Sequence, residues 1–293
     1  MSARACPACL ARSASGIGAV NGFDLVRCRR CGTLFTAALP AGAEDAKDYT
    51  DYYHDANLEI PEFVEDRLDS VAAGFEPYRR SGRWLDVGCG AGALMRAAAG
   101  RGWSVLGTEV APGAAEAVRS QGFDVELGTL EELELDEDSF DVVSLVEVVE
   151  HVEDPGALIA RSASLVRPGG ALYLTTPHGR GISARMLGTR WSAVAPPEHL
   201  QLLSVRGVRG LLGRAGLAPR SIHAHAVNPY ELVSGLRRGR AETSADERME
   251  TGYRLNESLS SRRAGSAAKS ALNGLLSLAR LGDGLKVTAE RPG

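Results

Sequence analysis

A glycine-rich segment near residue 88 has the composition of a loop that binds a ligand through its backbone. The segment reads WLDV at residues 84–87 and GCGAG at residues 88–92. Because glycine has no Cβ, alternating glycines let the backbone approach a ligand and direct amide groups at it. The pattern alone is shared by NAD, FAD and S-adenosylmethionine (SAM) sites and by ordinary tight turns. The residues beyond it must decide among these ligands.

A carboxylate follows at the spacing that a nucleotide-like ligand requires. Glu109 ends the next predicted strand, 21 residues after Gly88. In this position it can accept hydrogen bonds from both hydroxyl groups of a ribose. A solvated acid at a strand end is the simpler alternative, but it is less common at this spacing. The glycines and this acid together predict a ribose-containing ligand.

Four of the five cysteines form two C-x-x-C pairs near the start of the chain. They are Cys6, Cys9, Cys28 and Cys31. Each pair can place two thiolates on one tetrahedral ion, and the arginines beside the second pair would offset the negative charge of a Zn(Cys)₄ centre. A redox C-x-x-C or isolated buried thiols would not predict two matched pairs. The pattern indicates structural zinc, because four thiolates leave no open position for catalysis.

Alternating strand and helix patterns must position these groups. Strands are expected at 83–87, 104–109, 123–127, 140–146, 171–176 and 218–226, and helices at 60–78, 92–100, 112–121, 155–166 and 205–215. Such alternation with short glycine turns indicates a doubly wound, mostly parallel α/β sheet. We expect four parts: a zinc-ribbon module at 1–36, the main domain at 45–228, a helical C-terminal insert at 229–283 and a final strand of the main sheet at 284–293.

Several further motifs follow one another in an order typical of one enzyme class. LDVGCGAG is followed by Glu109, then by FDVVSLVEVVEHVEDP, then by LVRPGGALYLTTPH. With these segments the chain resembles class I SAM-dependent methyltransferases of the small-molecule kind, similar to the ubiquinone-biosynthesis O-methyltransferases. The resemblance covers about residues 45–226 and the last strand. It implies a Rossmann-like, seven-stranded sheet and SAM as the cofactor.

The resemblance also implies which residues bind SAM. They are Asp86, Gly88, Gly90, Gly92, Glu109, Val110, Thr129, Leu130, Leu145 and Glu147. The first four match the loop around the methionine part of SAM, and Glu109 and Val110 match the ribose contacts. The family often has Gly-Asp after the third strand, but here Gly128 is followed by Thr129 and Leu130. The adenine contact is therefore assigned to the backbone of those two residues, with Glu131 as the alternative.

Three histidines are candidates for the base that removes a proton from the methyl acceptor. Methyl transfer from a sulfonium needs alignment above all, but an oxygen or nitrogen nucleophile also loses a proton. His151 is the first candidate base, because it closes the E-x-x-E-H pattern after the fourth strand. His178 follows the fifth strand, where ligands approach open α/β sheets. His199 is a third candidate, although this position in the family is more often structural.

The E-x-x-E-H pattern also suggests a divalent metal. Related ubiquinone-type enzymes hold an ion at this pattern, which here places Glu147, Glu150 and His151 together. A hard ion such as Mg²⁺ would lower the pKa of a bound acceptor hydroxyl. Equally, His151 could pack in the following loop while the acids are solvated. The sequence is compatible with both interpretations.

Composition limits the partners. The chain has 293 residues, a net charge of −4 and 44% hydrophobic residues, which argues against a membrane protein and against a nucleic-acid partner. The N-terminus lacks the apolar core of a signal peptide, so we expect a cytoplasmic protein.

We therefore expect SAM-dependent methyl transfer to a small-molecule acceptor. The acceptor would be an oxygen nucleophile of a specialised-metabolite, quinone or sugar intermediate. One alternative is an RNA methyltransferase that uses the zinc ribbon to bind RNA. Another is a non-catalytic scaffold that forms a homodimer through the leucines between residues 272 and 281.

Overall fold

The computed structural model describes residues 4–39, 62–228, 231–233, 235, 274, 276 and 278–293. The chain divides into two compact units. The first contains residues 1–40, 176–210 and 222–286, and the second contains residues 41–175, 211–221 and 287–293. Each unit is described by itself.

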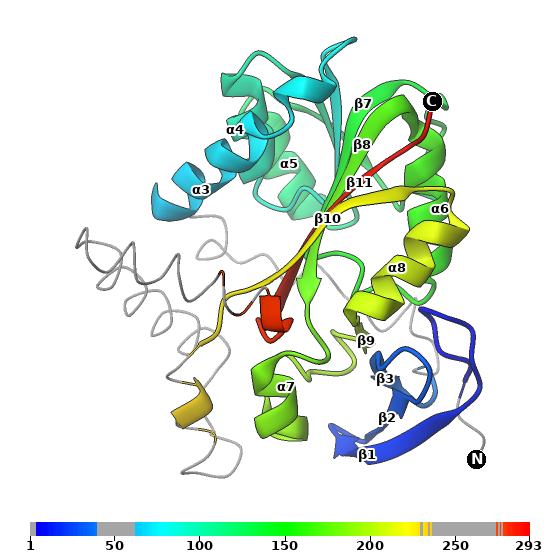
Figure 1. The fold of residues 1–293 in the computed structure, drawn as a ribbon. Helices are drawn as coiled ribbons and strands as arrows, with labels where there is room; N and C mark the ends of the chain where they lie inside the picture. Colours follow the sequence, from blue (N-terminus) through cyan, green and yellow to red (C-terminus); the bar gives the residue numbers. More distant parts are fainter. Residues whose placement is uncertain are drawn as a thin grey trace. The chain divides into compact units, whose positions relative to one another are not determined.

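A seven-stranded sheet is the main feature of the fold (Figure 1). In spatial order its strands are β10 (Ala218–His225), β11 (Gly284–Glu290), β8 (Val166–Pro177), β7 (Phe140–Val146), β4 (Arg83–Val87), β5 (Ser104–Glu109) and β6 (Asp124–Leu127). Strands β8, β7, β4, β5 and β6 run parallel to one another. The predicted doubly wound, mostly parallel sheet is confirmed.

The last strand runs against the direction of its neighbour β8. The Gly169 amide donates to the Arg291 carbonyl at 2.8 Å, whereas the His178 amide donates to the Asp283 carbonyl at 2.7 Å. The beginning of β8 therefore lies beside the end of β11, so the pair is antiparallel.

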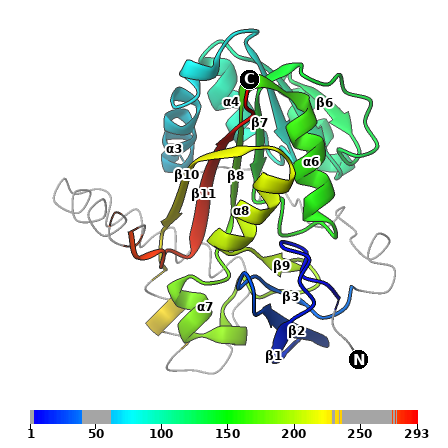
Figure 2. The same ribbon diagram turned by 45° about the vertical axis from the view of Figure 1, so that its right-hand side comes forward.

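Helices cover both faces of the sheet within the second unit. Figures 1 and 2 show α3 (Glu62–Ala73), α4 (Ala93–Gly100) and α5 (Pro112–Ser120) on one face and α6 (Pro155–Leu165) on the other. A 3₁₀ turn at Glu76–Tyr78 follows α3. Asp154 begins α6 as its N-cap, accepting hydrogen bonds from the amides of Gly156 and Ala157 at 2.8 and 3.0 Å.

An aromatic cluster fills the core between β4 and the helices α3 and α4. Phe75 lies edge-on to Trp84 and to Tyr173, and Trp84 lies edge-on to Trp103, with ring centroids 5.2 to 5.4 Å apart. All four rings are buried. Edge-to-face pairs of this kind contribute about 0.5–1.5 kcal/mol each beyond the area that they bury.

Strand β8 begins earlier than its sequence pattern predicts. We expected residues 167–170 to form a turn before a strand at 171–176, but β8 already starts at Val166, which pairs with Phe140. The register then shifts, so that Val142 pairs with Ala171. The shift accommodates the extra residues of the Pro-Gly-Gly segment, where Gly169 has a φ of +73°. The expected turn is an irregularity inside one strand.

The first unit contains a second, smaller sheet. A hairpin of β1 (Ala14–Val20) and β2 (Phe23–Cys28) pairs antiparallel with β3 (Leu34–Thr36), and β3 pairs with the short β9 (Gln201–Leu202) (Figure 2). The helices α7 (Ile182–Met186) and α8 (Val205–Arg214) and a 3₁₀ turn at Gly188–Arg190 complete the later part of the chain. We had not predicted β9, α7 or the 3₁₀ turn.

The ribbon and residues 184–202 share one hydrophobic core. Val20, Leu25 and Leu34 of the ribbon pack with Leu187 and Trp191, and all five side chains are buried. The Ser204 hydroxyl donates to the Cys31 carbonyl at 2.6 Å and accepts from the amide of Gly207, so the residue before α8 contacts the second C-x-x-C pair directly. In the structure, the cysteine-bearing segment is part of a larger unit rather than a free-standing module.

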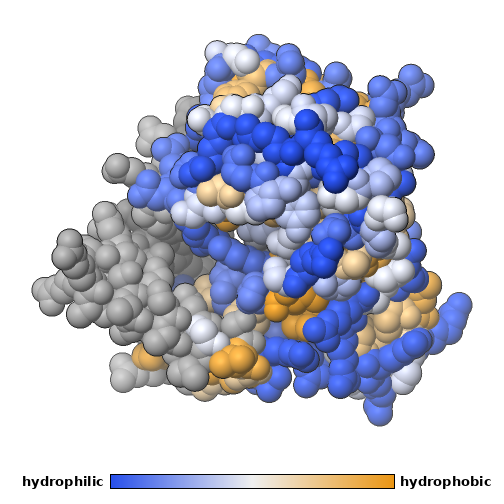
Figure 3. Space-filling model, turned by 45° about the horizontal axis from the view of Figure 1, so that its top comes forward, coloured by the Kyte–Doolittle hydropathy of each residue, from blue (hydrophilic) through white to orange (hydrophobic). Residues whose placement is uncertain are grey.

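Most of the predicted helical insert at 229–283 lies outside the described residues. Of the leucines between 272 and 281, Leu278 is 84% exposed, and Leu272 and Leu275 are among the residues not described. Within the described part of the chain, no helix combines the length and apolarity needed to cross a membrane. The face in Figure 3 is largely hydrophilic, with hydrophobic residues in separate patches.

Candidate functional site

The glycine loop joins β4 to α4 in a backbone conformation that suits glycine. Gly88, Gly90 and Gly92 have φ values of +65°, +53° and +74°. A Cβ on Gly88 would lie 2.8 Å from the Val148 side chain, so this position has no room for a side chain. The loop therefore presents bare backbone to its surroundings, as a ligand cradle requires.

The Glu109 carboxylate lies against this loop. One of its oxygens accepts a hydrogen bond from the Gly90 amide at 2.9 Å, and the other accepts from the amides of Val110 and Ala111 at 2.8 and 2.9 Å. Glu109 is 3% exposed, whereas Val110 is 38% exposed. The acid predicted from spacing to bind ribose is thus held in place next to the glycines by three backbone donors.

Asp86 is the second buried acid of the site. The Ser144 hydroxyl donates to its carboxylate at 2.6 Å and accepts from the Trp84 indole at 2.8 Å. Burial raises the pKa of Asp86 to about 7, with a smaller contribution from the negative charge of Glu109, while the Ser144 hydrogen bond opposes the rise. A cation beside Asp86 would favour its ionised form.

The turn after β6 lies next to Glu109. The Gly128 amide donates to the Glu109 carbonyl at 2.9 Å, which places Thr129 and Leu130 near the end of β5. Leu130 is buried, and the exposed Thr129 donates its amide and hydroxyl to the Glu132 carboxylate at 3.0 and 2.9 Å. The loops after β4, β5 and β6 thus meet at one edge of the sheet.

The segment after β7 contains the remaining predicted residues of the second unit. Leu145 is buried at the end of β7, and the exposed Glu147 follows with a φ of +55°. Ligand atoms of Glu150 and His151 lie within 4.8 Å of each other, but Glu147 does not join them. Glu150 is fully buried. The predicted set of three metal ligands is therefore not assembled as a set among the described residues.

The other two candidate histidines lie in the first unit and have different surroundings. His178 is 2% exposed, and its Nδ1 lies 2.9 Å from the Gly282 carbonyl. Burial, together with the positive charges of nearby arginines, lowers its pKa to about 4, while the hydrogen bond with the Gly282 carbonyl opposes the shift. His199 is half-buried, with its Nδ1 2.8 Å from the Ala193 carbonyl. That contact within its own loop is one a structural histidine would make.

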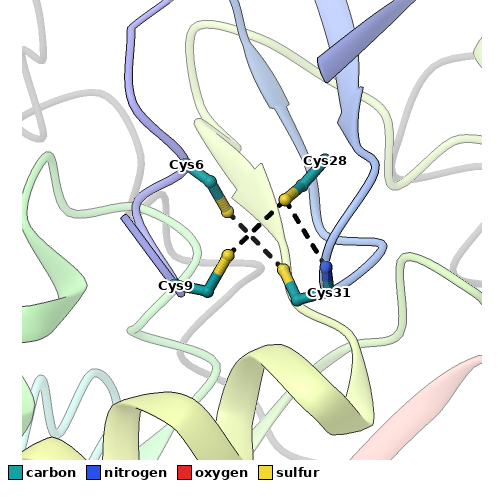
Figure 4. Close-up of side chains that lie close together, drawn as sticks. All are labelled: Cys6, Cys9, Cys28 and Cys31. Carbon is teal, nitrogen blue, oxygen red and sulfur yellow. Dashed lines mark hydrogen bonds between the residues drawn. The ribbon is translucent and has the colours of Figure 1, made fainter. Parts of the chain in front are cut away.

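The four predicted zinc ligands come together in the first unit. Their sulfur atoms all lie within 4.8 Å of one another, and Figure 4 shows them pointing at a common centre. Two pairs are hydrogen-bonded, Cys6 with Cys31 at 3.6 Å and Cys9 with Cys28 at 3.5 Å. Thiolates about 2.3 Å from a zinc ion would be about 3.8 Å apart in a tetrahedron. The arrangement fits one zinc ion.

The surroundings of the cluster favour the negatively charged thiolate form of one of the four cysteines. The hydrogen bond from Cys6, with further donors at Thr33, lowers the pKa of Cys31 to about 4. The same pairing raises the pKa of Cys6. The Cys31 amide also points at the Cys28 sulfur at 3.5 Å. Amide and hydroxyl donors around ligand sulfurs stabilise the thiolates that zinc requires.

Two residues of the site escaped the sequence analysis. Ser144, which bonds Asp86, is with Asp141 one of two polar residues in the buried strand β7, and that contrast with the apolar residues around it was its available signal. Val148, which packs against Gly88, has no sequence signal, because only the three-dimensional contact shows its role.

Known proteins share this architecture. A family model described as "Methyltransferase domain" matches residues 55–222. A ubiquinone biosynthesis O-methyltransferase of Xanthomonas axonopodis is 38% identical over 180 residues, covering 58% of this chain and 66% of that protein. A protein of the same name from Xylella fastidiosa is 33% identical over 165 residues, covering 53% and 64%. The chain thus matches slightly less than two thirds of the length of these relatives.

Solved structures show the same fold at low sequence identity. A SAM-dependent methyltransferase from Archaeoglobus fulgidus has a TM-score of 0.55 at 16% identity, with 83% of this chain and all of that chain covered. One from Mesorhizobium loti has a TM-score of 0.50 at 21% identity, with 76% and 100% covered. The family match and the fold, with the glycine loop beside a buried acid, define a class I SAM methyltransferase. The chain belongs to the methyltransferase-domain family, which confirms the resemblance seen in the sequence.

Proposed function

We propose that the protein transfers a methyl group from SAM to an oxygen atom of a small-molecule acceptor. The hydrogen bond between the Gly90 amide and the Glu109 carboxylate supports this most directly, because it joins the two halves of a SAM-binding site. The names of the relatives support an oxygen acceptor. A quinone, specialised-metabolite or sugar hydroxyl is the class of acceptor we propose.

The residues present fit SAM. The glycine loop, where Val148 and Val118 leave no room for a side chain on Gly88 and Gly92, would hold the methionine part through its backbone, and Glu109 would accept from the ribose hydroxyls. Val110, Thr129 and Leu130 would border the adenine. SAM supplies a methyl group that is already activated on a sulfonium, so the chain's task is to align the acceptor and exclude water. Leu145 and Glu147 would border the transferred methyl group.

Removal of the acceptor proton is assigned to a histidine. His151 is the preferred base, since it follows β7 directly beside Glu150. His178 is a weaker base because its pKa of about 4 lies far below neutral pH. If a divalent ion such as Mg²⁺ takes part, Glu150 and His151 are the residues that would hold it. Its role would be to lower the pKa of the acceptor hydroxyl.

The cysteine cluster is assigned to structural zinc. The sulfur spacing and the donors around Cys28 and Cys31 support this assignment. With four thiolates, the ion has no position for substrate. Its role would be to hold the ribbon in its folded form.

The test of the proposed function has two parts. Calorimetry of the full chain with SAM should show binding, and mass spectrometry of candidate hydroxyl compounds incubated with protein and SAM should show a gain of one methyl group. Parallel reactions with added Mg²⁺ and with a chelator decide whether a divalent ion takes part. Absence of SAM binding would contradict the proposal and leave the non-catalytic scaffold as the better description.

Glu109→Gln should weaken SAM binding about 10- to 100-fold. The substitution removes the charge from the hydrogen bonds to ribose, each worth about 1.5–3 kcal/mol, and turns an amide group toward the Gly90, Val110 and Ala111 donors. Calorimetry with SAM measures the change. Glu116→Gln is the matched control, because that side chain is 77% exposed. Equal affinity in both variants would refute the ribose assignment.

A further inference from the structure

A group of arginines that have no acidic partner among the described residues lies near His178 in the first unit. Residues 4–39 and 176–210 contain ten arginines, no lysine and two acids, Asp24 and Glu198, although the whole chain has a net charge of −4. Even a Zn(Cys)₄ centre with its charge of −2 leaves these segments strongly positive. Positive charge is therefore concentrated in these two segments, whereas the rest of the chain carries a net negative charge.

Three of these arginines converge on the segment that follows β8. Arg27 of β2 donates from Nη1 to the carbonyl oxygens of Gly179 and Gly32, at 2.5 and 3.2 Å. The Arg180 side chain lies over the same Gly32, where a Cβ would be 2.7 Å from its Cδ and 3.0 Å from its Nη1. Arg185 of α7 donates from Nε to the Arg180 carbonyl at 2.9 Å.

The charges of these groups are not neutralised within the described part of the chain. No ion pair there joins Arg27, Arg180 or Arg185 to a carboxylate within 4.0 Å. Asp283, whose backbone carbonyl accepts from the His178 amide, uses its carboxylate to accept from the Ser183 amide and hydroxyl at 2.8 and 2.6 Å.

Three arginines close together with no carboxylate partner among the described residues repel one another, and only Arg27 lies next to the cysteine cluster, whose proposed zinc centre would offset part of its charge. A guanidinium group presents several N–H donors in a planar fork that matches the oxygens of a phosphate. Arg27 uses Nη1 for the two carbonyls, which leaves its other nitrogens for a ligand. Arg180 and Arg185 are exposed and can close on the ligand from solvent.

We propose that Arg27, Arg180 and Arg185 form a binding site for a phosphate group carried by the methyl acceptor. The link to the acceptor rests on the proposed function. The position of His178, directly after the carboxyl end of β8, supports it. Ligands of open α/β sheets bind outside the carboxyl ends of the strands. The acceptor is accordingly a phosphorylated small molecule with a free hydroxyl.

Binding of inorganic phosphate and pyrophosphate to the full-length protein without SAM tests the site itself. Calorimetry at constant ionic strength, with chloride and acetate as comparison anions, should show saturable binding of the two phosphate probes. Arg180→Gln and Arg185→Gln should each weaken it about tenfold, since hydrogen bonds to charged groups are worth about 1.5–3 kcal/mol. Both side chains are exposed, so the fold should tolerate the changes. Arg12→Gln is the control, an exposed arginine of the same unit.

A second measurement reports on the place of binding. Because the positive charges of Arg27, Arg180 and Arg185 lower the pKa of His178, a bound phosphate should raise it. Nuclear magnetic resonance of the histidine ring signals, with His178→Asn to assign the signal, should show its titration move to higher pH only when phosphate is present. A pKa of His178 that stays at the same value in saturating phosphate would overturn the location.

The outcomes separate this site from the proposed function. Phosphate binding that is lost in the two arginine variants supports the site even if no acceptor is ever methylated. SAM binding with no specific phosphate binding overturns the site and leaves methyl transfer standing. A short RNA that binds with a steep salt dependence, and that phosphate does not displace, would replace the small acceptor by nucleic acid.

Discussion

Asp86→Asn should weaken SAM binding and at the same time stabilise the SAM-free protein above neutral pH. Asp86 is 3% exposed, and burial raises its pKa to about 7. The carboxylate is therefore ionised only partly at neutral pH when no ligand is bound. In the proposed site the positively charged methionine part of SAM lies beside this carboxylate, so ligand binding should ionise it fully. The asparagine cannot provide that charge.

The binding effect has a defined dependence on pH. If SAM binds the ionised form of Asp86, its affinity for the natural protein should rise about tenfold between pH 6 and pH 8, because the ionised fraction rises by that factor around a pKa of 7. The asparagine variant should lack this rise. Calorimetry of both proteins across the range measures it, and any titration of SAM itself cancels in the comparison. Parallel affinity profiles for the two proteins would refute the role of Asp86.

The stability effect has the opposite sign. The pKa of Asp86 is higher in the folded protein than in the unfolded chain, so its contribution to stability is complete below about pH 4 and is lost as pH rises through about 7. Asparagine avoids this loss. The free energy of unfolding should therefore be greater in the variant by on the order of 2–4 kcal/mol at pH 8, with little difference at pH 4.

Fluorescence can follow this unfolding close to the substitution. The Trp84 indole donates to Ser144, which in turn donates to Asp86. Trp84 and Trp103 lie in the second unit and Trp191 in the first, so a Trp191→Phe background isolates the signal of the second unit. Urea unfolding at pH 4 and pH 8 in that background gives the difference. A variant that is less stable than the natural protein at pH 8 would contradict the cost assigned to the buried charge.

The positions of Asp86 and Glu109 show what the sequence could predict. Strands β4, β5 and β7 begin and end where the sequence patterns predict, because each is an apolar run between strong turn residues. The glycines fix the loop locally, and parallel pairing of β4 with β5 then places Glu109 beside it. Local pattern and sheet order together were sufficient for this part of the site.

Other contacts have no local signal. The bond between Ser144 and Asp86 joins neighbouring strands, and its formation depends on their register. The pairing of Leu34 with Leu202 is less accessible still, since β9 has only two residues and shows no periodicity. The resemblance of the E-x-x-E-H pattern to related enzymes suggested Glu147 as one of three metal ligands, and the pattern gives no indication of the turn at that residue, where φ is +55°. Contacts between residues far apart in the sequence determine these features.

Cys28→Ser should release zinc and unfold part of the first unit while leaving SAM binding intact. Cys28 is buried and lies 3.5 Å from Cys9 in the cluster, so its loss leaves three thiolates for the ion. Binding free energies of structural zinc sites are about 10–16 kcal/mol in isolated zinc-finger peptides. Loss of even part of this energy exceeds what the small ribbon core can replace. The proposed SAM site lies in the second unit, and its affinity should not change.

The hydrophobic core that the ribbon shares with residues 184–202 determines how much of the first unit unfolds when zinc is lost. Val20, Leu25 and Leu34 of the ribbon pack with Trp191, which is 5% exposed. Unfolding of the ribbon should therefore expose Trp191 and shift its fluorescence emission to longer wavelength. If the ribbon were a separate module, as the sequence alone suggested, zinc would leave without any change at Trp191. The emission spectrum thus distinguishes a shared core from an independent module.

Matched variants make the measurement specific. Cys89→Ser is the same chemical change at the fifth cysteine, which is buried in the glycine loop of the second unit and does not belong to the cluster. It should retain one zinc ion per chain and the natural Trp191 emission. In a Trp191→Phe background, Cys28→Ser should lose the red shift, because Trp84 and Trp103 pack in the other unit. Full zinc content in Cys28→Ser would refute the four-cysteine site. Zinc loss with unchanged Trp191 emission would contradict the coupling of the zinc site to the shared core and favour a separate ribbon module.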